Sequence, residues 1–184
     1  MRPFQGKAGL PESSAGETVR DILIRATEDA IRSVDAARFF QTERGFHGRF
    51  YCTLQHQLER AGLIANNAIL EMEYQKSQRH GTSQRPDIVF HIPAEYSHAL
   101  VTENNFAVWA LKRRASESDA RSDFDRLDDM FKTLHYQLGF FVNVDSADPM
   151  LRCYTGAYSN CLAAVAARLT DAQILVKWAP DPEP

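Results

Sequence analysis

Two apolar, strand-like segments of the sequence each carry one charged residue in a position that suggests chemistry. Asp87 stands near the start of residues 85–90, and Lys112 stands near the end of residues 106–114. A charge inside an apolar run is costly unless it is paired or used. Alternate residues of a strand share a face, so Ala110 and Lys112 are expected to point the same way. An acid at position 110 would complete a cluster able to hold a divalent metal and cut phosphodiesters.

The residue types follow from the chemistry of that reaction. Hydrolysis of a phosphodiester adds negative charge to a phosphate that is already anionic. Mg²⁺ (or Mn²⁺) held by carboxylates polarises the phosphoryl oxygen and lowers the pKa of an attacking water, and an ammonium stabilises the developing charge. We expect Asp87 and an acid at position 110 to bind the metal, the Leu111 carbonyl to add a third oxygen, and Lys112 to face the scissile phosphate. Ala110 removes one of the two principal carboxylates from this scheme and leaves Lys112 without its local counter-ion.

Hydrophobic spacing predicts the elements that must position these residues. Helical spacing predicts helices over 18–40, 42–61 and 120–138 and a largely helical segment over 150–169. Strand patterns predict strands over 68–76, 86–92, 106–113, 140–144 and 174–178. Three strands in succession imply an antiparallel meander, and a helix before the fourth strand implies a parallel crossover. The expected fold is a single α/β domain over residues 17–178, with a central mixed sheet flanked by helices.

This order of elements, with its charged positions, resembles the PD-(D/E)xK nuclease superfamily, whose restriction-endonuclease-like core runs helix, three-stranded meander, helix, strand. The Pro-Asp of the motif falls on residues 86–87 and its (D/E)xK segment on residues 110–112, with Ala110 in place of the acid. The resemblance covers residues 43–144, and Glu43 resembles the acid that many members contribute to the metal cluster from a helix. It implies Mg²⁺-dependent hydrolysis of nucleic acid, with DNA favoured over RNA, and an activity impaired or lost because of Ala110.

The sequence leaves the meaning of Ala110 open. It is either an engineered replacement of Glu or Asp that silences a toxic nuclease or traps a substrate, or the mark of a natural pseudonuclease. Such a pseudonuclease would keep the fold to bind nucleic acid or a protein. A third hypothesis is an interaction subunit that docks through residues 18–40. By analogy with the habits of the family, a chain of this size would serve as an effector nuclease in bacterial defence, or would take specificity from a homodimer or partner subunit.

Further residues flank the predicted site. Basic side chains that would neutralise backbone phosphates are Lys76, Arg79, Arg85, Arg113, Arg114 and Arg121. Polar accessory candidates are Glu73, Gln75, His91, Tyr136 and Gln137. Each has a plainer interpretation: the basic residues suit a solvated surface, and a lone histidine is more often part of the hydrogen-bonded structure. An acid placed as Glu43 is more often at the N-terminal end of a helix because of the helix dipole than because it binds a metal.

Composition places the chain among globular proteins outside the membrane. Of its 184 residues, 44% are hydrophobic and 24% charged, and the formal net charge of -3 argues against indiscriminate coating of nucleic acid. The sequence has no Cys-x-x-Cys pair among its three cysteines, Cys52, Cys153 and Cys161. Their spacing predicts free thiols in a reducing cytoplasm. No apolar run approaches the ~20 residues of a membrane span. Residues 1–16 and 179–184 are expected to form a flexible arm and a disordered tail.

Overall fold

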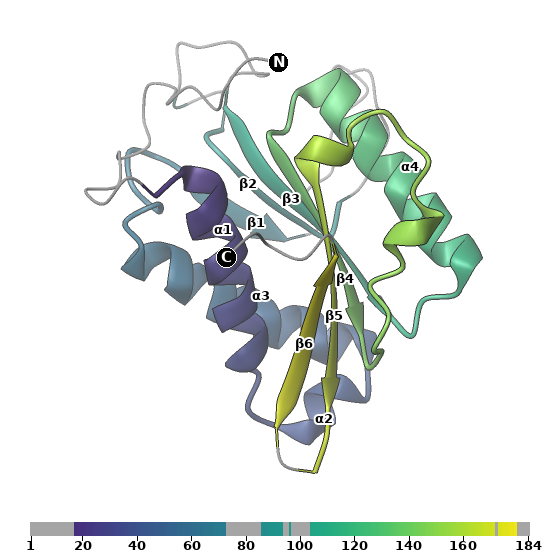
Figure 1. Ribbon diagram of the computed structural model, residues 1–184. Helices are drawn as coiled ribbons and strands as arrows, with labels where there is room; N and C mark the ends of the chain where they lie inside the picture. The colour runs from purple at the N-terminus through teal and green to yellow at the C-terminus, as the bar shows by residue number, and fades with distance from the viewer. Residues whose placement is uncertain (1–16, 73–85, 94–95, 97–103, 172, 180–184) are drawn as a thin grey trace.

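Six strands form one mixed sheet in the computed structural model, which describes residues 17–72, 86–93, 96, 104–171 and 173–179 (Figure 1). The strands lie in chain order: β1 Ile69–Met72, β2 Ile88–His91, β3 Asn105–Arg113, β4 Leu138–Val144, β5 Leu162–Leu169 and β6 Ile174–Ala179. β1, β2 and β3 pair antiparallel, β3, β4 and β5 pair parallel, and β6 returns antiparallel. The predicted α/β class, the meander and the parallel crossover are confirmed.

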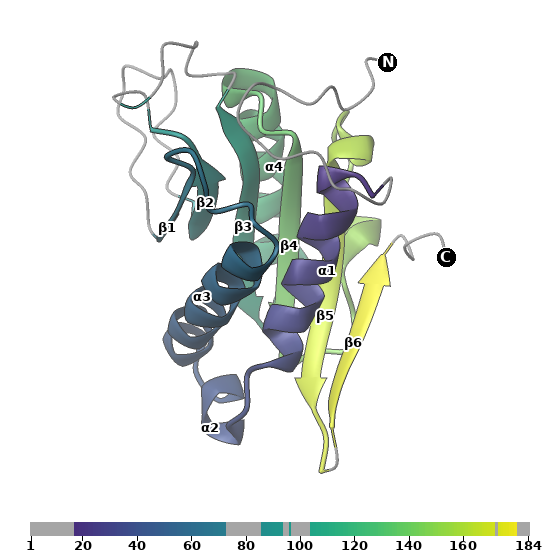
Figure 2. The ribbon, with the colours of Figure 1, turned by 90° about the vertical axis from the view of Figure 1, so that its left-hand side faces the viewer.

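Helices cover both faces of this sheet. α1 (Val19–Arg32), α2 (Ala37–Phe40) and α3 (Glu43–Arg60) lie on one side, and α4 (Glu117–Leu134) lies on the other (Figures 1 and 2). α4 begins with a capping box in which Ser116 and Asp119 satisfy each other's backbone N–H groups. It packs closely because β4 carries Gly139, where a Cβ would lie 2.4 Å from the Phe131 ring. The position of α4 against the sheet is therefore set at both of its ends.

The central strand β3 sends alternate side chains into two cores. Trp109 belongs to the core beneath α1 and α3, where it is fully buried, stacks on Phe140 at 5.1 Å and donates through Nε1 to Thr27 Oγ1 at 3.1 Å. Ala110 packs against the other core, the one formed with α4. Since residues two apart share a face, Lys112 also lies on the α4 side. The face expected to carry the chemistry is thus the one that α4 covers.

Three of the predicted helices differ in the structure. The helix predicted over 120–138 ends at Leu134, and Leu138 begins β4 instead. The segment 150–169 is not largely helical: it contains the short 3₁₀ turns Leu151–Cys153 and Ser159–Cys161, and then strand β5. Residues 162–167 are buried on both faces of the sheet. The periodicity of such a continuous apolar run does not distinguish a strand from a helix, and the alanines in it favour a helix. The segment is a strand because it pairs with β4. The single helix predicted over 18–40 is interrupted after Arg32.

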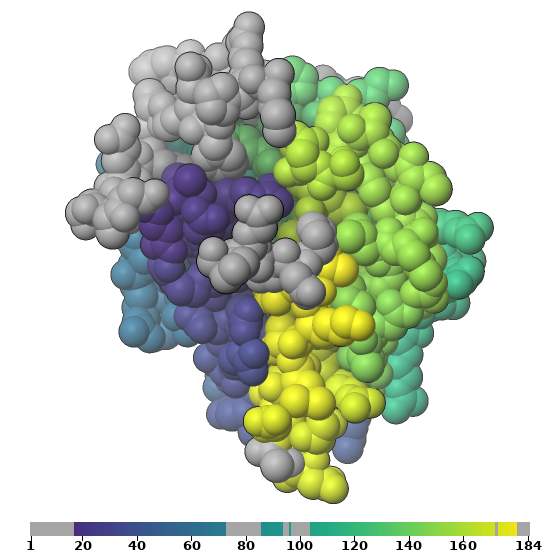
Figure 3. All heavy atoms as spheres, in the orientation of Figure 1, coloured from purple at the N-terminus to yellow at the C-terminus, as the bar shows by residue number. Residues whose placement is uncertain are grey.

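α1 lies beside the last strand on the face shown in Figure 3. Trp178 Nε1 donates to Glu28 Oε2 at 2.8 Å, and Arg32 Nη1 donates to the Ile174 carbonyl at 3.1 Å. The three cysteines are free thiols, as predicted. Among the described residues, no helix combines the length and the apolar character that crossing a bilayer requires.

Candidate functional site

Asp87, Ala110 and Lys112 line one pocket, as the sequence predicts. The pocket lies between the neighbouring ends of β2 and β3 and helix α4, which contributes Asp123 and Arg126 to its wall. Its cavity volume is about 40 Å³, with room for roughly three water-sized species. The two β-segments therefore direct an aspartate, an alanine and an ammonium into one shared space.

The pocket exists because β2 begins one residue after Asp87. Ile88 pairs with Trp109, so the backbone of β3 beyond that pair has no β2 partner. Two carboxylates take the released N–H groups: Asp87 Oδ2 accepts from Leu111 N at 2.7 Å, and Glu43 Oε2 accepts from Arg113 N at 3.1 Å. The N–H and C=O of a strand residue point to the same edge, so the Leu111 carbonyl also faces this gap.

Two residues of α3, Glu43 and His47, act electrostatically on Asp87. Burial raises the pKa of Asp87, while the hydrogen bond from Leu111 and the charges of His47 and Lys112 act to lower it. The Glu43 carboxylate acts with burial and raises this pKa further. His47 was not predicted as a site residue, although it follows Glu43 by four residues, the spacing of one helix face. Its buried Nε2 has no hydrogen-bond partner among the described residues.

A second unpredicted residue, Asp123, is buried in the wall of the pocket and is only 3% exposed. Its Oδ1 accepts from Arg126 Nη1 at 2.9 Å. Its Oδ2 is 4.0 Å from Lys112 Nζ and has no hydrogen-bond partner in the described part of the chain. Asp123 lies on the buried stripe of α4, between Ala120 and Leu127, where an apolar side chain is the rule. An acid at a position of the apolar stripe was therefore the sequence signal that could have identified Asp123.

The burial of Asp123 leads to a prediction about stability and pH. Burial raises the pKa of Asp123 from its ordinary 3.8 to about 6, against the opposing charges of Lys112 and Arg126. The folded state then holds more protons than the unfolded state between these values, so this group's stabilisation is complete below pH 4 and is lost as pH rises to about 6. At 1.36 kcal/mol per pH unit the loss amounts to about 3 kcal/mol.

Asp123→Asn should therefore be more stable than the parent chain at pH 7.5, by up to about 3 kcal/mol, and by less at pH 5.0. Urea denaturation at both pH values, in buffer with a metal chelator, measures the difference. Asp125→Asn changes an exposed carboxylate of the same helix and is the matched control. A gain for Asp123→Asn that is the same at both pH values would contradict the raised pKa.

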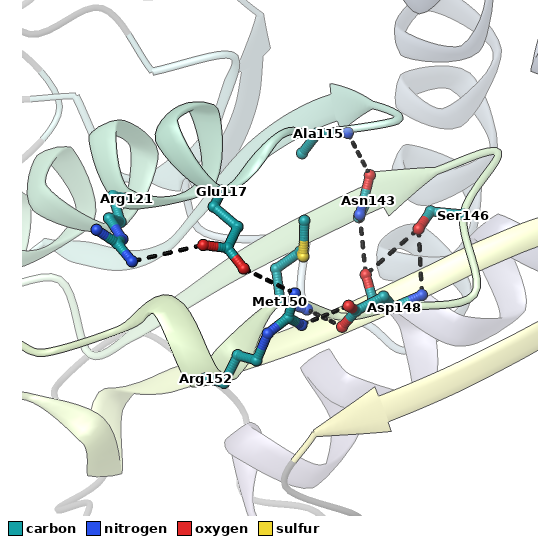
Figure 4. A network of polar contacts seen from close by, with 8 residues as sticks. All are labelled: Ala115, Glu117, Arg121, Asn143, Ser146, Asp148, Met150 and Arg152. Carbon is teal, nitrogen blue, oxygen red and sulfur yellow. Dashed lines mark hydrogen bonds and ion pairs between the residues drawn. The ribbon is translucent and has the colours of Figure 1, made fainter.

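Asn143 fixes the connection between the end of β3 and the start of α4. It lies opposite Lys112 in β4 and is fully buried. Its Oδ1 accepts from Ala115 N at 3.0 Å, and its Nδ2 donates to the Asp148 carbonyl at 2.8 Å (Figure 4). The network continues through the Asp148 carboxylate to Arg152, and from there to Glu117 and Arg121 at the beginning of α4 (Figure 4). The helix that carries Asp123 is thereby tied to the strands that carry Lys112 and its neighbours.

The predicted basic residues divide by their contacts. Arg113 is held within the fold, since its Nε donates to the Phe40 carbonyl at 2.8 Å and its Nη2 contacts Asp145 at 2.6 Å. Arg114 also pairs with Asp145, at 2.8 Å, and Arg121 pairs with Glu117 at 3.6 Å, but both of these side chains are mostly exposed. Arg114 and Arg121 therefore remain available to phosphates, whereas Arg113 has a structural role.

The accessory candidates that the structure describes lie away from the pocket. The backbone N of Gln137 donates to the Phe106 carbonyl at 3.3 Å, which places it, with its buried neighbour Tyr136, at the beginning of β3. Lys112 lies near the other end, about 20 Å along the strand. His91 ends β2 and pairs with Glu71 at 2.6 Å. The candidates that lie outside the described residues are Glu73, Gln75, Lys76, Arg79 and Arg85.

The donor set suits Mg²⁺ or Mn²⁺ better than a softer metal. Within the described ranges, no three His, Cys, Asp or Glu side chains are already grouped for a metal. Mg²⁺ does not need such a cage, because it keeps several waters and is held by one or two carboxylates together with substrate phosphates. The residues fit such an ion on one observation: a buried carboxylate oxygen, Asp123 Oδ2, has no hydrogen-bond donor among the described residues around the pocket.

Comparisons of the chain with protein-family models, with curated proteins and with solved structures find no significant match.

Proposed function

We propose that this pocket hydrolyses phosphodiester bonds of nucleic acid, with DNA as the first candidate substrate and Mg²⁺ or Mn²⁺ as cofactor. The observation that carries the proposal is the convergence of Asp87, Ala110 and Lys112 on one pocket beside Glu43. The order α3, β1, β2, β3, α4, β4, with β3 and β4 parallel, supports a restriction-endonuclease-like core. It is the order of helix, meander, helix and strand that the nuclease resemblance implies.

The residues divide the work by their charge and position. Asp87 would hold the metal, which supplies Lewis acidity and a more acidic water when it is bound. The Leu111 carbonyl faces the same gap and would add an oxygen. Lys112 points into the pocket, where its ammonium would stabilise charge on the phosphate. Glu43 reaches the open edge of β3, where it accepts from Arg113 N, and His47 acts electrostatically on Asp87, so these two residues would orient the attacking water.

Ala110 favours a second candidate function, that of a catalytically silent nuclease fold that binds nucleic acid or a protein. A binding module of this kind predicts salt-sensitive binding that does not depend on metal, and no cleavage with any residue at position 110. The exposed arginines Arg114 and Arg121 suit either function.

Cleavage of plasmid DNA and of RNA by the chain and by Ala110→Glu, with Mg²⁺, with Mn²⁺ and with a chelator, separates the two candidates. The proposal expects metal-dependent cleavage by at least one of the two proteins. If neither protein cleaves, and if a chelator does not change the binding of nucleic acid, the binding module would replace the nuclease as the proposed function.

A further inference from the structure

We propose that Asp123 supplies the carboxylate that Ala110 lacks, so that the chain as it stands holds a divalent cation with Asp87 and is an active nuclease. This inference rests on the proposed function and goes beyond it, because it assigns the second acid to helix α4 instead of strand β3. It also reverses the expectation that Ala110 inactivates the chain.

The first support is position. Asp123 lines the same pocket as Asp87, Ala110 and Lys112, and it enters from the wall opposite the strands. The cavity that both aspartates line is small, with a volume of about 40 Å³. Two carboxylates in the wall of one small pocket repel unless a proton or a cation lies between them. A divalent cation in the pocket would remove this repulsion.

The second support is the unsatisfied oxygen. Asp123 is buried, with only 3% of it exposed, and the fold supplies a donor, Arg126, to only one of its two oxygens among the described residues. A buried carboxylate oxygen without a donor costs free energy, so its retention needs a reason. Lys112 Nζ is too far away for a hydrogen bond, at 4.0 Å. A cation or its bound water would satisfy this oxygen.

The third support is the charge of Asp123 and the space that Ala110 leaves in the pocket. Asp123 restores the negative charge that an acid at position 110 would have carried, and it gives Lys112 a counter-ion. The methyl group of Ala110 fills little of the pocket, whereas a glutamate there would enter the space that Asp123 faces. A small residue on β3 and an acid on α4 thus complement each other. The plainer role for Asp123 is that of an ion partner for Lys112 and Arg126.

The test compares five proteins by two readouts: the chain, Asp123→Asn, Ala110→Glu, Ala110→Glu with Asp123→Asn, and the control Asp125→Asn. Mn²⁺ titration calorimetry measures metal binding directly, and plasmid cleavage measures activity. We expect the chain to bind Mn²⁺ and cleave, Asp123→Asn to bind Mn²⁺ at least ~10-fold more weakly, and the double variant to regain affinity because the acid has moved to the strand. Asp125→Asn should match the parent. Thermal denaturation checks that every variant is folded.

Equal Mn²⁺ affinity for the chain and Asp123→Asn would overturn the inference and leave Asp123 as an ion partner. If the parent chain does not cleave and Ala110→Glu does, the inference about Asp123 would also be overturned, while the proposed nuclease function would stand. Absence of both metal binding and cleavage in the parent chain and in Ala110→Glu would remove the proposed function, and the inference with it.

Discussion

Asp87→Asn is expected to lower metal-dependent cleavage on the order of 10²–10³-fold and to weaken Mn²⁺ binding, in whichever background cleaves, the chain itself or Ala110→Glu. The substitution keeps the size of the side chain and removes the charge of the one carboxylate in the pocket that β2 directs there. The amide oxygen of the introduced side chain can still accept the hydrogen bond that Asp87 takes from Leu111 N at 2.7 Å, so the local fold should persist. Cleavage rates and Mn²⁺ titration calorimetry measure the two effects.

Asp171→Asn is the matched control, because Asp171 is exposed in the turn before β6. It carries the same change of charge and should alter neither readout. A measurement of stability distinguishes a catalytic effect of Asp87→Asn from a structural one. Because burial raises the pKa of Asp87, its neutral replacement should not destabilise the metal-free protein at pH 7.5. Retained cleavage in Asp87→Asn would exclude Asp87 as the metal-binding acid.

The convergence of Asp87, Ala110 and Lys112 could be predicted because it depends on local rules. Side chains alternate along a strand, and consecutive strands of a meander lie side by side. These two rules placed position 110 and Lys112 on one face of β3, and Asp87 at the adjoining end of β2, before any tertiary contact was known. The structure adds that β2 starts at Ile88, which opens the edge of β3 to the carboxylates.

The contributions of the helices could not be predicted in the same way. His47 and Asp123 reach the site only because of how α3 and α4 are rotated against the sheet, and packing far along the chain sets that rotation. Gly139, which brings α4 close, is one example. Strand β5 shows the same limit, since the burial of residues 162–167 on both faces depends on a β4 neighbour that periodicity does not reveal.

The presence of Asp123 changes how Ala110 is interpreted. With β3 considered alone, Ala110 is a missing ligand, and either deliberate replacement or loss of function explains it. With α4 in place, the charged residues of the pocket wall are Asp87, Asp123, Lys112 and Arg126, and the small side chain of Ala110 leaves space among them. On the proposal made above, an alanine at this position is compatible with activity, and no engineered change is needed to explain it.

Lys112→Met is expected to lower cleavage on the order of 10²-fold without weakening the binding of Mn²⁺. Methionine keeps most of the aliphatic stem and removes the ammonium, which lies 4.0 Å from Asp123 Oδ2. Removing a positive charge from a pocket that contains Asp87 and Asp123 favours a cation there, so the affinity for Mn²⁺ should stay the same or rise. Asp87→Asn lowers both quantities, and Lys112→Met should separate them.

Lys177→Met, on the exposed face of β6, is the control for the loss of one positive charge and should leave cleavage and Mn²⁺ affinity unchanged. Separating the cleavage rate from the affinity for Mn²⁺ matters because a lysine with only a structural role predicts a different result. If Lys112 served only to neutralise Asp123, its loss would lower the stability of the fold and leave cleavage by the folded protein unchanged. Cleavage by folded Lys112→Met at the parent's rate would therefore count against a lysine that acts on the phosphate, and slower cleavage with unchanged or tighter Mn²⁺ binding would support it.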